Sequence, residues 1–215
     1  SAVSGAVVDS LAAAGIGSLA VTRIEGRTRY QTASRVASAT IDALGEAWSG
    51  HAFLATGRAF ADALSVGPVS ASSGSPVYLT DEARWSETLA TMKAAGVTDV
   101  TIVGGVDAVS SAVQTQLAEE LGGSAHVRRV GGSDRYATAS ALASFALARA
   151  GFVAANPGIA TGVDWADAAT AGPLLGKRNA PLLLVKQLEV ADSTAAWLYT
   201  QRDQVTGLTE FGGDA

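Results

Sequence analysis

The chain has 215 residues, and because 48% of them are hydrophobic we expect a folded protein with a core of ordinary size. Charged residues make up only 16%, and the formal net charge of −5 argues against a nucleic-acid binder, which would need a strongly basic face. The chain has no cysteine, which excludes disulfides, thiolate metal sites and cysteine nucleophiles. Its two histidines, His51 and His126, are too few for a histidine-rich metal site, so no metal is expected. No apolar run reaches the roughly 18 residues of a membrane-spanning helix.

The first predicted element is a helix at the N-terminus. Val3, Val7, Val8 and Leu11 follow a helical spacing, which indicates a chain that was processed or excised before Ser1. Residues 2–7 are similar to residues 108–113, which open a later predicted helix. Residues 1–18 are therefore expected to complete a neighbouring repeat, covered by the other half of the chain or by a second molecule.

The rest of the chain predicts strands that alternate with helices, because short apolar runs ending in glycine or a polar turn are separated by alanine-rich stretches. The expected strands of the first half are Leu19–Ile24, His51–Ala55, Pro76–Leu79 and Asp99–Val103. The expected helices between them are Tyr30–Leu44, Ala61–Ser72, Ser86–Ala95 and Val109–Leu121. Strands recur in the second half at Val127–Val130, Gly158–Thr161, Pro181–Val185 and Thr209–Phe211. Such alternation predicts α/β units with parallel sheets covered by helices on both faces.

The two halves are copies of one another. Residues 23–34 match 129–140 without a gap, and three further blocks match in the same order: 55–63 with 160–168, 75–80 with 180–185, and 102–105 with 210–213. We therefore predict two homologous units of about 100 residues, at 19–122 and 123–215, linked by Gly122-Gly123-Ser124. The units are expected to superpose, with the same strand order in each.

Two kinds of turn recur where a predicted strand ends and a helix begins: Thr56-Gly57 with Thr161-Gly162, and Gly104-Gly105 with Gly212-Gly213. Ligands of open α/β sheets bind at this carboxyl edge, where helix N–H groups point outward. The glycines could instead serve only the tight turns. No dinucleotide fingerprint or P-loop is complete, so no cofactor is predicted.

Asp62 and Asp167 each stand early in a predicted helix, where a carboxylate can stabilise the helix N-terminus. A catalytic role would need a partner base or a metal, and none recurs nearby in the sequence. No nucleophile elbow or zinc-peptidase motif is present either.

Four arginines recur in register: Arg23 with Arg129, and Arg29 with Arg135. Tyr30 and Tyr136 follow the second pair directly. A guanidinium forks onto a carboxylate or phosphate, and the phenol beside it can stack on a sugar or donate a hydrogen bond. The alternative is that each arginine pairs with a local carboxylate such as Asp62 or Asp134.

The tryptophans are interpreted as core or repeat-interface residues rather than as a carbohydrate platform. They stand at positions 48, 85, 165 and 197. Trp165 occupies the slot that Phe60 occupies in the first half, which favours packing. Both histidines are expected to be structural or exposed, because neither recurs in the other half.

The repeated blocks, Arg-Ile-x-Gly-x-x-Arg-Tyr-x-Thr-Ala, Ala-Thr-Gly-x-x-Phe/Trp-Ala-Asp-Ala, Pro-(apolar)3 and Val-Gly-Gly, resemble the cell-wall-binding repeat type 2 family across nearly the whole chain, twice. The resemblance implies tandem Rossmann-like α/β modules that attach a secreted protein non-covalently to anionic polymers of a Gram-positive wall. It also implies modules that commonly occur in threes and assemble as a pseudo-trimer. The chain departs from the family pattern at Arg27-Thr28, where the second half has the more usual Ser133-Asp134.

We therefore expect a non-catalytic module, located at the cell wall or cell surface, that binds a teichoic-acid-like polymer or secondary polysaccharide. Its other expected partners are further repeats or a repeat-mediated oligomer, and not nucleic acid or a membrane. The alternatives are an amidase-like wall hydrolase or other α/β enzyme that uses Asp62 and Asp167, and a purely structural surface protein. Duplication of every notable residue favours a multivalent binder. The ligand-binding residues predicted are Arg23, Arg29, Tyr30, Thr56, Gly57, Asp62, Gly104, Gly105, Arg129, Arg135, Tyr136, Thr161, Gly162 and Asp167.

Overall fold

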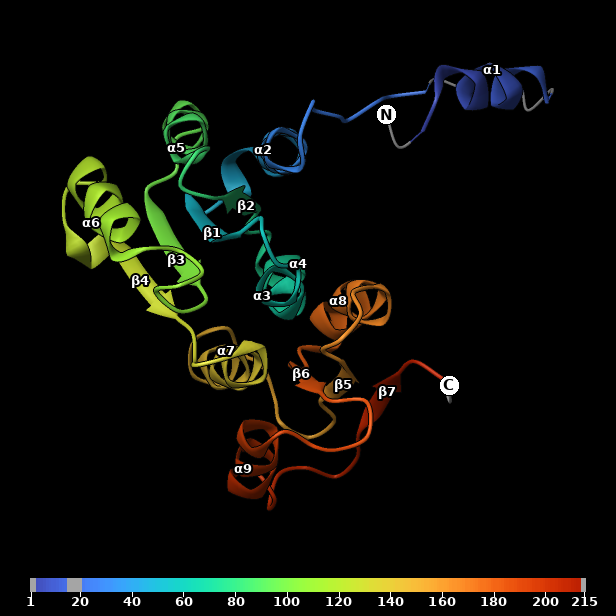
Figure 1. Ribbon diagram of the computed structural model, residues 1–215, viewed down its shortest axis with the longest axis vertical. Helices are drawn as coiled ribbons and strands as arrows, with labels where there is room; N and C mark the ends of the chain where they lie inside the picture. Colours follow the sequence, from blue (N-terminus) through green and yellow to red (C-terminus); the bar gives the residue numbers. More distant parts are fainter. Residues whose placement is uncertain (1–2, 15–20, 214–215) are drawn as a thin grey trace.

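The computed structural model describes residues 3–14 and 21–213, which build two parallel sheets flanked by helices (Figure 1). The strands of the first sheet run in the order β2-β1-β3-β4, and those of the second in the order β6-β5-β7. Their bounds are β1 His51–Thr56, β2 Val77–Thr80, β3 Asp99–Val103, β4 Val127–Val130, β5 Gly158–Thr161, β6 Leu182–Val185 and β7 Thr209–Phe211. Seven of the eight predicted strands are therefore confirmed to within a residue or so at each end.

The helices lie between the strands, as the alternation predicts. Their bounds are α1 Gly5–Ala13, α2 Arg29–Leu44, α3 Ala61–Ser65, α4 Gly67–Ser73, α5 Trp85–Ala94, α6 Ser111–Glu120, α7 Arg135–Arg149, α8 Ala166–Arg178 and α9 Asp192–Thr200, with 3-10 turns η1 Gly45–Ala47 and η2 Ser124–His126. Short polar side chains begin the two long helices: the Thr28 hydroxyl accepts from the backbone N–H of Gln31, and Asp134 accepts from that of Ala137. The departure at Arg27-Thr28 thus preserves the helix cap.

The three strands that the two units have in common follow the same order, β2-β1-β3 and β6-β5-β7, as predicted, whereas the first predicted strand of each unit does not share a place in this order. All pairings are parallel, β1 between β2 and β3 in the first sheet, and β5 between β6 and β7 in the second. One difference concerns the predicted helix Ala61–Ser72, which is two helices in the first unit, whereas the matching α8 is continuous. Pro68 is the second residue of α4, but Pro173 stands at the matching position inside the continuous α8, so the proline by itself does not cause the break.

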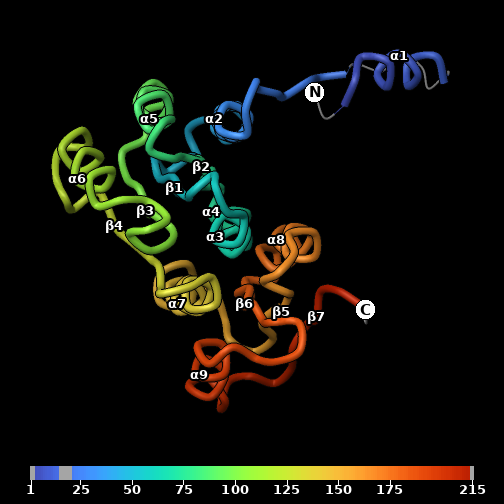
Figure 2. Tube along the Cα trace, viewed as in Figure 1, coloured from blue at the N-terminus to red at the C-terminus, as the bar shows by residue number. Residues whose placement is uncertain are grey.

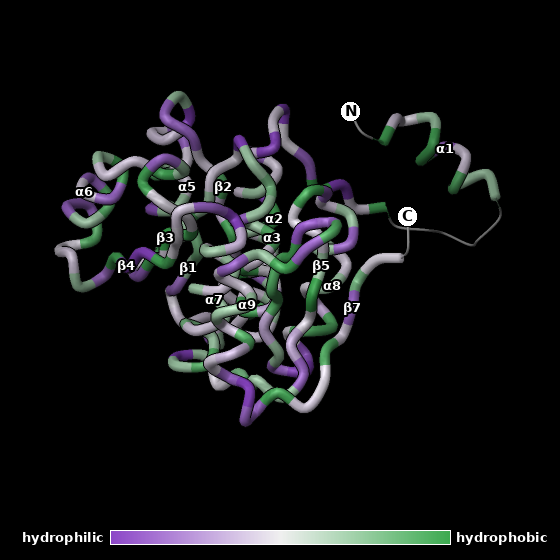
Figure 3. Tube along the Cα trace, turned by 60° about the horizontal axis from the view of Figure 1, so that its bottom comes forward, coloured by the Kyte–Doolittle hydropathy of each residue, from purple (hydrophilic) through white to green (hydrophobic). Residues whose placement is uncertain are grey.

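The first sheet is the middle of three layers. One apolar cluster packs α2, α5 and α6 on one face, around Tyr78, Leu54 and Ile102. A second cluster packs α3, α4 and α7 on the other face, around Phe53 and Val103. Coloured by hydropathy, the molecule shows its apolar stretches mainly on these inner strands and helices (Figure 3).

The two units share a strand and a helix. β4 follows Gly122-Gly123-Ser124, yet it pairs with β3 and completes the first sheet. That tripeptide therefore joins elements of one sheet, and the chain passes to the second sheet only after Val130 (Figure 2). The repeat boundary between residues 122 and 123 stays a prediction. The expectation that Gly122-Gly123-Ser124 links two separate sheets is wrong, because the strands on either side of it belong to the same sheet. Short strands exposed at an edge gain backbone hydrogen bonds by joining a neighbouring sheet.

α7 lies between the two sheets and packs against both of them. Leu142 and Ala146 face the first sheet, whereas Ala143 faces the second. α2 matches α7 in the repeat but has a single buried residue, Ala37, against six in α7. Val36, at the position that matches Leu142, is 48% exposed. The outer face of α2 thus lacks the cover that the first unit provides for α7.

The segment before α2 shows the same contrast. A strand was predicted over Leu19–Ile24; residues 19 and 20 lie outside the described range, and residues 21–24 are not a strand. Val21 and Ile24 are exposed, whereas the matching Val127 and Val130 are buried in β4. The prediction is wrong for residues 21–24 because a strand needs a partner, and no neighbouring sheet in the described chain pairs with them.

α1 stands apart from the body of the molecule, and none of its residues is buried (Figures 1 and 3). Val7 and Leu11 are 47% and 46% exposed. This contradicts the expectation that the other half of the same chain covers the helix. Cover by a neighbouring repeat or a second molecule stays a prediction.

Candidate functional site

Arg29 and Tyr30 both contact the Thr56-Gly57 turn at the end of β1. The Arg29 Nη1 donates to the Gly57 carbonyl at 3.0 Å. A Cβ on Gly57 would lie 2.1 Å from Cε1 of Tyr30, so only glycine fits against this ring. The Tyr30 hydroxyl donates to Asp81, and this hydrogen bond raises the pKa of the tyrosine. Turn-making and close packing therefore account for this glycine.

The second unit repeats the arrangement with one change. The Arg135 Nη1 donates to the Gly162 carbonyl at 2.5 Å, and a Cβ on Gly162 would lie 2.7 Å from Cε1 of Tyr136. Lys186 takes the position of Asp81; its ammonium group pairs with Glu189, and it also lies close enough to Tyr136 to interact electrostatically with it. In the first unit the positive charges of Arg29 and Arg58 also lie close enough to Tyr30 to interact electrostatically with it. Each tyrosine is thus flanked by two cationic side chains at the carboxyl edge of its sheet.

Arg129 holds the Gly104-Gly105 turn. Its Nη1 donates to both glycine carbonyls at 3.0 Å, and its Nε donates to Gln114 at 2.9 Å. Burial lowers the pKa of this guanidinium from its usual value. Gly104 has a φ of +105°, a conformation that glycine adopts without strain. Most of the donors of Arg129 already have partners within the chain.

Asp62 faces the junction between the units. Burial raises the pKa of its carboxyl group, opposed by a hydrogen bond from Thr138 and by the charge of Arg135. Both of those groups belong to α7, so the carboxylate joins the first unit to the second. Asp167, its counterpart, lies against Gly212, where an added Cβ would come within 3.0 Å of its Oδ2.

A cavity of about 430 Å³ lies at the junction, between the Gly104-Gly105 turn and the start of α7. Asp62, Gly105 and Arg135 line it, and the Arg135 guanidinium lies 5.6 Å from the centre of the Phe60 ring. Asp107 and Asp134 line it too, so its charge is mainly negative. The second unit has a matching cavity of about 360 Å³, lined by Thr161, Asp167 and Gly212.

The four arginines singled out in the sequence do not form one cluster. Arg29 and Arg135 hold their Thr-Gly turns, Arg129 holds the Gly-Gly turn, and Arg23 donates to the Val3 carbonyl at 2.8 Å and pairs with Glu25. Thr56 and Thr161 each accept from a backbone N–H two residues on. Arg58 and Lys186 were missed because neither recurs in the other unit.

The tryptophans divide into two groups. Trp85 and Trp197 are 6% and 5% exposed, and Trp48 packs against the core, as predicted. Trp165 is 60% exposed, so the core interpretation is wrong for this residue. Its counterpart Phe60 is covered by Arg135 of the following unit, and no following unit covers Trp165 in the described chain.

His51 is structural: its ring nitrogens contact the Ser75 and Thr101 hydroxyls, and burial lowers its pKa. Within residues 3–14 and 21–213, no group of three or more acidic, histidine or cysteine side chains could hold a metal ion. None of the helices in that part of the chain has the length and apolar character needed to cross a membrane.

The fold and the repeated carboxyl-edge turns define a tandem α/β repeat protein. The chain belongs to the family Cell wall binding domain 2 (CWB2), which matches residues 23–114 and 129–215, and it is a cell-wall-binding module. It is 30% identical to the N-acetylmuramoyl-L-alanine amidase LytC of Bacillus subtilis (strain 168) over 82% of this chain and 33% of that protein. It is also 30% identical to the amidase enhancer of the same organism, over 90% of this chain and 24% of that protein.

Two solved structures share the fold. Cwp8 from Clostridium difficile has a TM-score of 0.76 and 23% identity, with 98% of this chain and 34% of that chain covered. Cwp6 from the same organism has a TM-score of 0.66 and 22% identity, with 89% and 32% covered. This chain therefore spans about a third or less of the length of each of these relatives.

Proposed function

We propose that this chain attaches a secreted protein non-covalently to an anionic polymer of the wall, such as a teichoic-acid-like polymer or a secondary polysaccharide. The observation that carries the proposal is the pair of cations beside each repeated tyrosine, Arg29 and Arg58 in the first unit and Arg135 and Lys186 in the second. The Nη1 of Arg29 donates to the Gly57 carbonyl. The side chain is exposed, so its other N–H donors can reach a ligand.

The charge of the chain requires a local site of this kind. A net charge of −5 gives no long-range attraction to a polyanion, so binding must come from local clusters. Exposed contacts are individually weak and are screened over about 8 Å at physiological salt. Two such sites on one chain raise the overall affinity through avidity. The mainly acidic junction cavity would suit the hydroxyl groups of the polymer rather than its anionic groups.

The test is a pull-down of the chain with purified wall, before and after removal of the secondary polymers. We expect binding that falls as salt rises, falls modestly in Arg29→Gln, and falls at least tenfold in the double variant Arg29→Gln/Arg135→Gln. The matched control is Arg149→Gln/Arg178→Gln, which removes the same charge from exposed sites near helix ends. Thermal unfolding measured beside binding separates a lost ligand contact from a lost fold. Unchanged binding by a folded double variant at every salt concentration would contradict the proposal.

We further propose that the chain itself is not catalytic. The support is that Asp62 lies against Thr138 and Arg135 across the unit junction and that its counterpart Asp167 packs on a glycine turn, so both carboxylates have structural contacts. Among the described residues, no histidine lines the cavity of either unit, and Lys186, which lines the second, pairs with Glu189. The same wall incubation tests this, since the supernatant can be assayed for released fragments. Fragment release that is lost in Asp62→Asn or Asp167→Asn would instead establish the hydrolase alternative.

We also infer that another unit of the same kind covers the outer face of α2, either as a further repeat or in a second copy of this chain. What supports this is the match between exposed Val36 and Ile24 and their buried counterparts, Leu142 and Val130. Sedimentation velocity should show self-association of this chain as its concentration rises, and Val36→Glu should abolish it. Sedimentation that shows only a monomer at every concentration, for both proteins, would exclude a repeat-mediated oligomer.

A further inference from the structure

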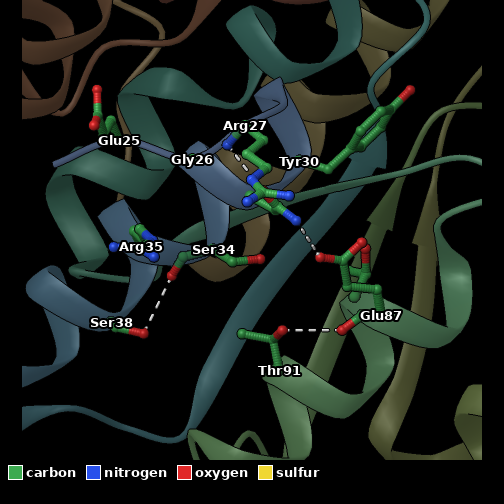
Figure 4. A pocket seen from close by; sticks show the side chains of 11 residues that line it. Glu25, Gly26, Arg27, Tyr30, Ser34, Arg35, Ser38, Glu87 and Thr91 are labelled. Carbon is green, nitrogen blue, oxygen red and sulfur yellow. Dashed lines mark hydrogen bonds between the residues drawn. The ribbon is translucent and has the colours of Figure 1, made fainter.

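A groove of the first unit lies between α2 and α5, away from the junction. It has a volume of about 750 Å³, within the range of about 300–1,000 Å³ found for ligand sites. Figure 4 shows Ser34 and Ser38 of α2 on one side and Glu87 and Thr91 of α5 on the other. Arg27 and Arg35 also line it.

The groove exists because the first unit lacks a tryptophan that the second unit has. Trp197 packs between α9 and α7, and its Nε1 donates to the Ser144 hydroxyl at 3.1 Å. Ser38 matches Ser144 by continuing the register of the first aligned block. Thr91 matches Trp197 because the equivalent hydroxyls of Thr88 and Thr194, each three residues earlier, donate to the Leu79 and Leu184 carbonyls. The small Thr91 side chain turns back to the Glu87 carbonyl, so the volume that an indole fills in the second unit stays open.

The polar groups that line the groove differ in whether they have partners. Glu25 pairs with Arg23, and Glu87 accepts from Gln31 at 2.8 Å. In contrast, no hydrogen bond or ion pair within the described residues involves the guanidinium of Arg27 or of Arg35. Both side chains are exposed. The groove therefore has neutralised carboxylates and two available cations.

These cations belong to the first unit alone. Ser133 and Ala141 stand at the matching positions of the second unit, so both arginines and the missing tryptophan distinguish the two copies. The Ser34 hydroxyl also has no hydrogen bond within the described part of the chain. Its counterpart, the Ser140 hydroxyl, is buried without a partner beneath the filled site. The first unit thus has the Ser34 hydroxyl in an accessible groove, whereas the matching Ser140 hydroxyl of the second unit is buried.

We propose that this groove binds a sugar unit that carries a carboxylate or a phosphate group. Guanidinium groups bind both anions through paired N–H donors, and serine hydroxyls match the hydroxyl groups of a saccharide. Because Trp197 fills the matching space in the second unit, the site belongs to the first unit of the described chain. The groove shares Tyr30 with the carboxyl-edge site of the first unit, but its own cations, Arg27 and Arg35, are not those of that site, and the proposal does not depend on the role of Arg29 and Arg58.

Titration with small probes, followed by NMR, tests the proposal on the whole chain. N-acetylmuramic acid supplies a sugar carboxylate, glucose 6-phosphate a sugar phosphate, and N-acetylglucosamine a neutral sugar. We expect at least one anionic probe to bind at least tenfold more tightly than the neutral sugar, and its affinity to fall as salt rises. The anionic probe that binds more tightly shows whether the groove prefers a carboxylate or a phosphate. Equal binding of all three probes, or no binding, would overturn the proposal.

Two variants place the binding in the groove. Thr91→Trp fills it with the side chain that the second unit uses, and Arg27→Gln/Arg35→Gln removes its cations; each should weaken probe binding at least tenfold. The charge-matched control Arg149→Gln/Arg178→Gln should bind normally. Arg29→Gln/Arg135→Gln should also bind the probe normally, which separates this site from the proposed polymer site. Normal probe binding by a folded Arg27→Gln/Arg35→Gln variant would overturn the proposal, even if Thr91→Trp fails to fold.

Discussion

Replacing Leu142 with alanine should lower the free energy of unfolding by about 2–5 kcal/mol. Leu142 is 1% exposed and packs among Phe53, Val103 and Val130 of the first sheet. The substitution removes apolar contacts and leaves a cavity where two units meet, so the whole junction loses stability. Urea unfolding followed by circular dichroism measures the change.

The repeat supplies a matched control for this variant. Val36 stands at the corresponding position of α2 but is 48% exposed in the single chain, so at concentrations where the chain is monomeric Val36→Ala should change the free energy of unfolding by less than about 0.5 kcal/mol. Equal losses for the two variants would show that the outer face of α2 is covered in solution. A negligible loss for Leu142→Ala would contradict the packing of α7 on the first sheet.

Arg129→Gln should lower the free energy of unfolding by about 2–4 kcal/mol, because the half-buried guanidinium makes several charge-assisted hydrogen bonds. Its loss removes the Arg129 donor from both the Gly104 and Gly105 carbonyls, of which, among the described residues, only Gly105 keeps backbone donors, the N–H groups of Ala108 and Val109. Arg129→Lys keeps the charge but not the forked geometry, so it should restore only part of the stability. Thermal and urea unfolding measure both variants.

Arg23→Gln is the control, because Arg23 has the matching sequence position but an exposed site with one carboxylate partner. We expect a change within about 0.5 kcal/mol for this variant. An Arg129→Gln protein of normal stability that no longer binds wall polymer would contradict the structural role and favour the ligand-binding role predicted from the sequence.

Much of the fold follows from local patterns. The strand β3 is predicted at Asp99–Val103 and β4 at Val127–Val130, with the bounds that the structure has. Apolar runs that end at glycine turns, and alanine-rich stretches between them, carry this information within a few residues of each element. The repeat of these patterns also predicts the equal strand order of the two units. Local sequence therefore determined the α/β class, most of the elements and their duplication.

The candidate site was predicted less completely, because the prediction rested on residues that recur in both units. Asp62 and Arg135 were chosen and do line one cavity, but Arg129 recurs in sequence without being free to bind. Arg27 and Arg35 were passed over because they occur once. A comparison of differences between the copies, such as Thr91 against Trp197, would have found the groove between α2 and α5.

Only the tertiary structure decided which copy of each repeated residue is buried. Val21 and Val127 have the same local sequence pattern, yet Val127 pairs in the first sheet and Val21 is exposed. Phe60 is covered by an arginine of the following unit, whereas Trp165 is open. The physical reason is that each unit buries its apolar faces on its neighbour, so burial depends on what lies beside a unit. The sequence by itself determined the elements of each unit; their contacts determined which of the repeated side chains hold the fold and which remain free to bind.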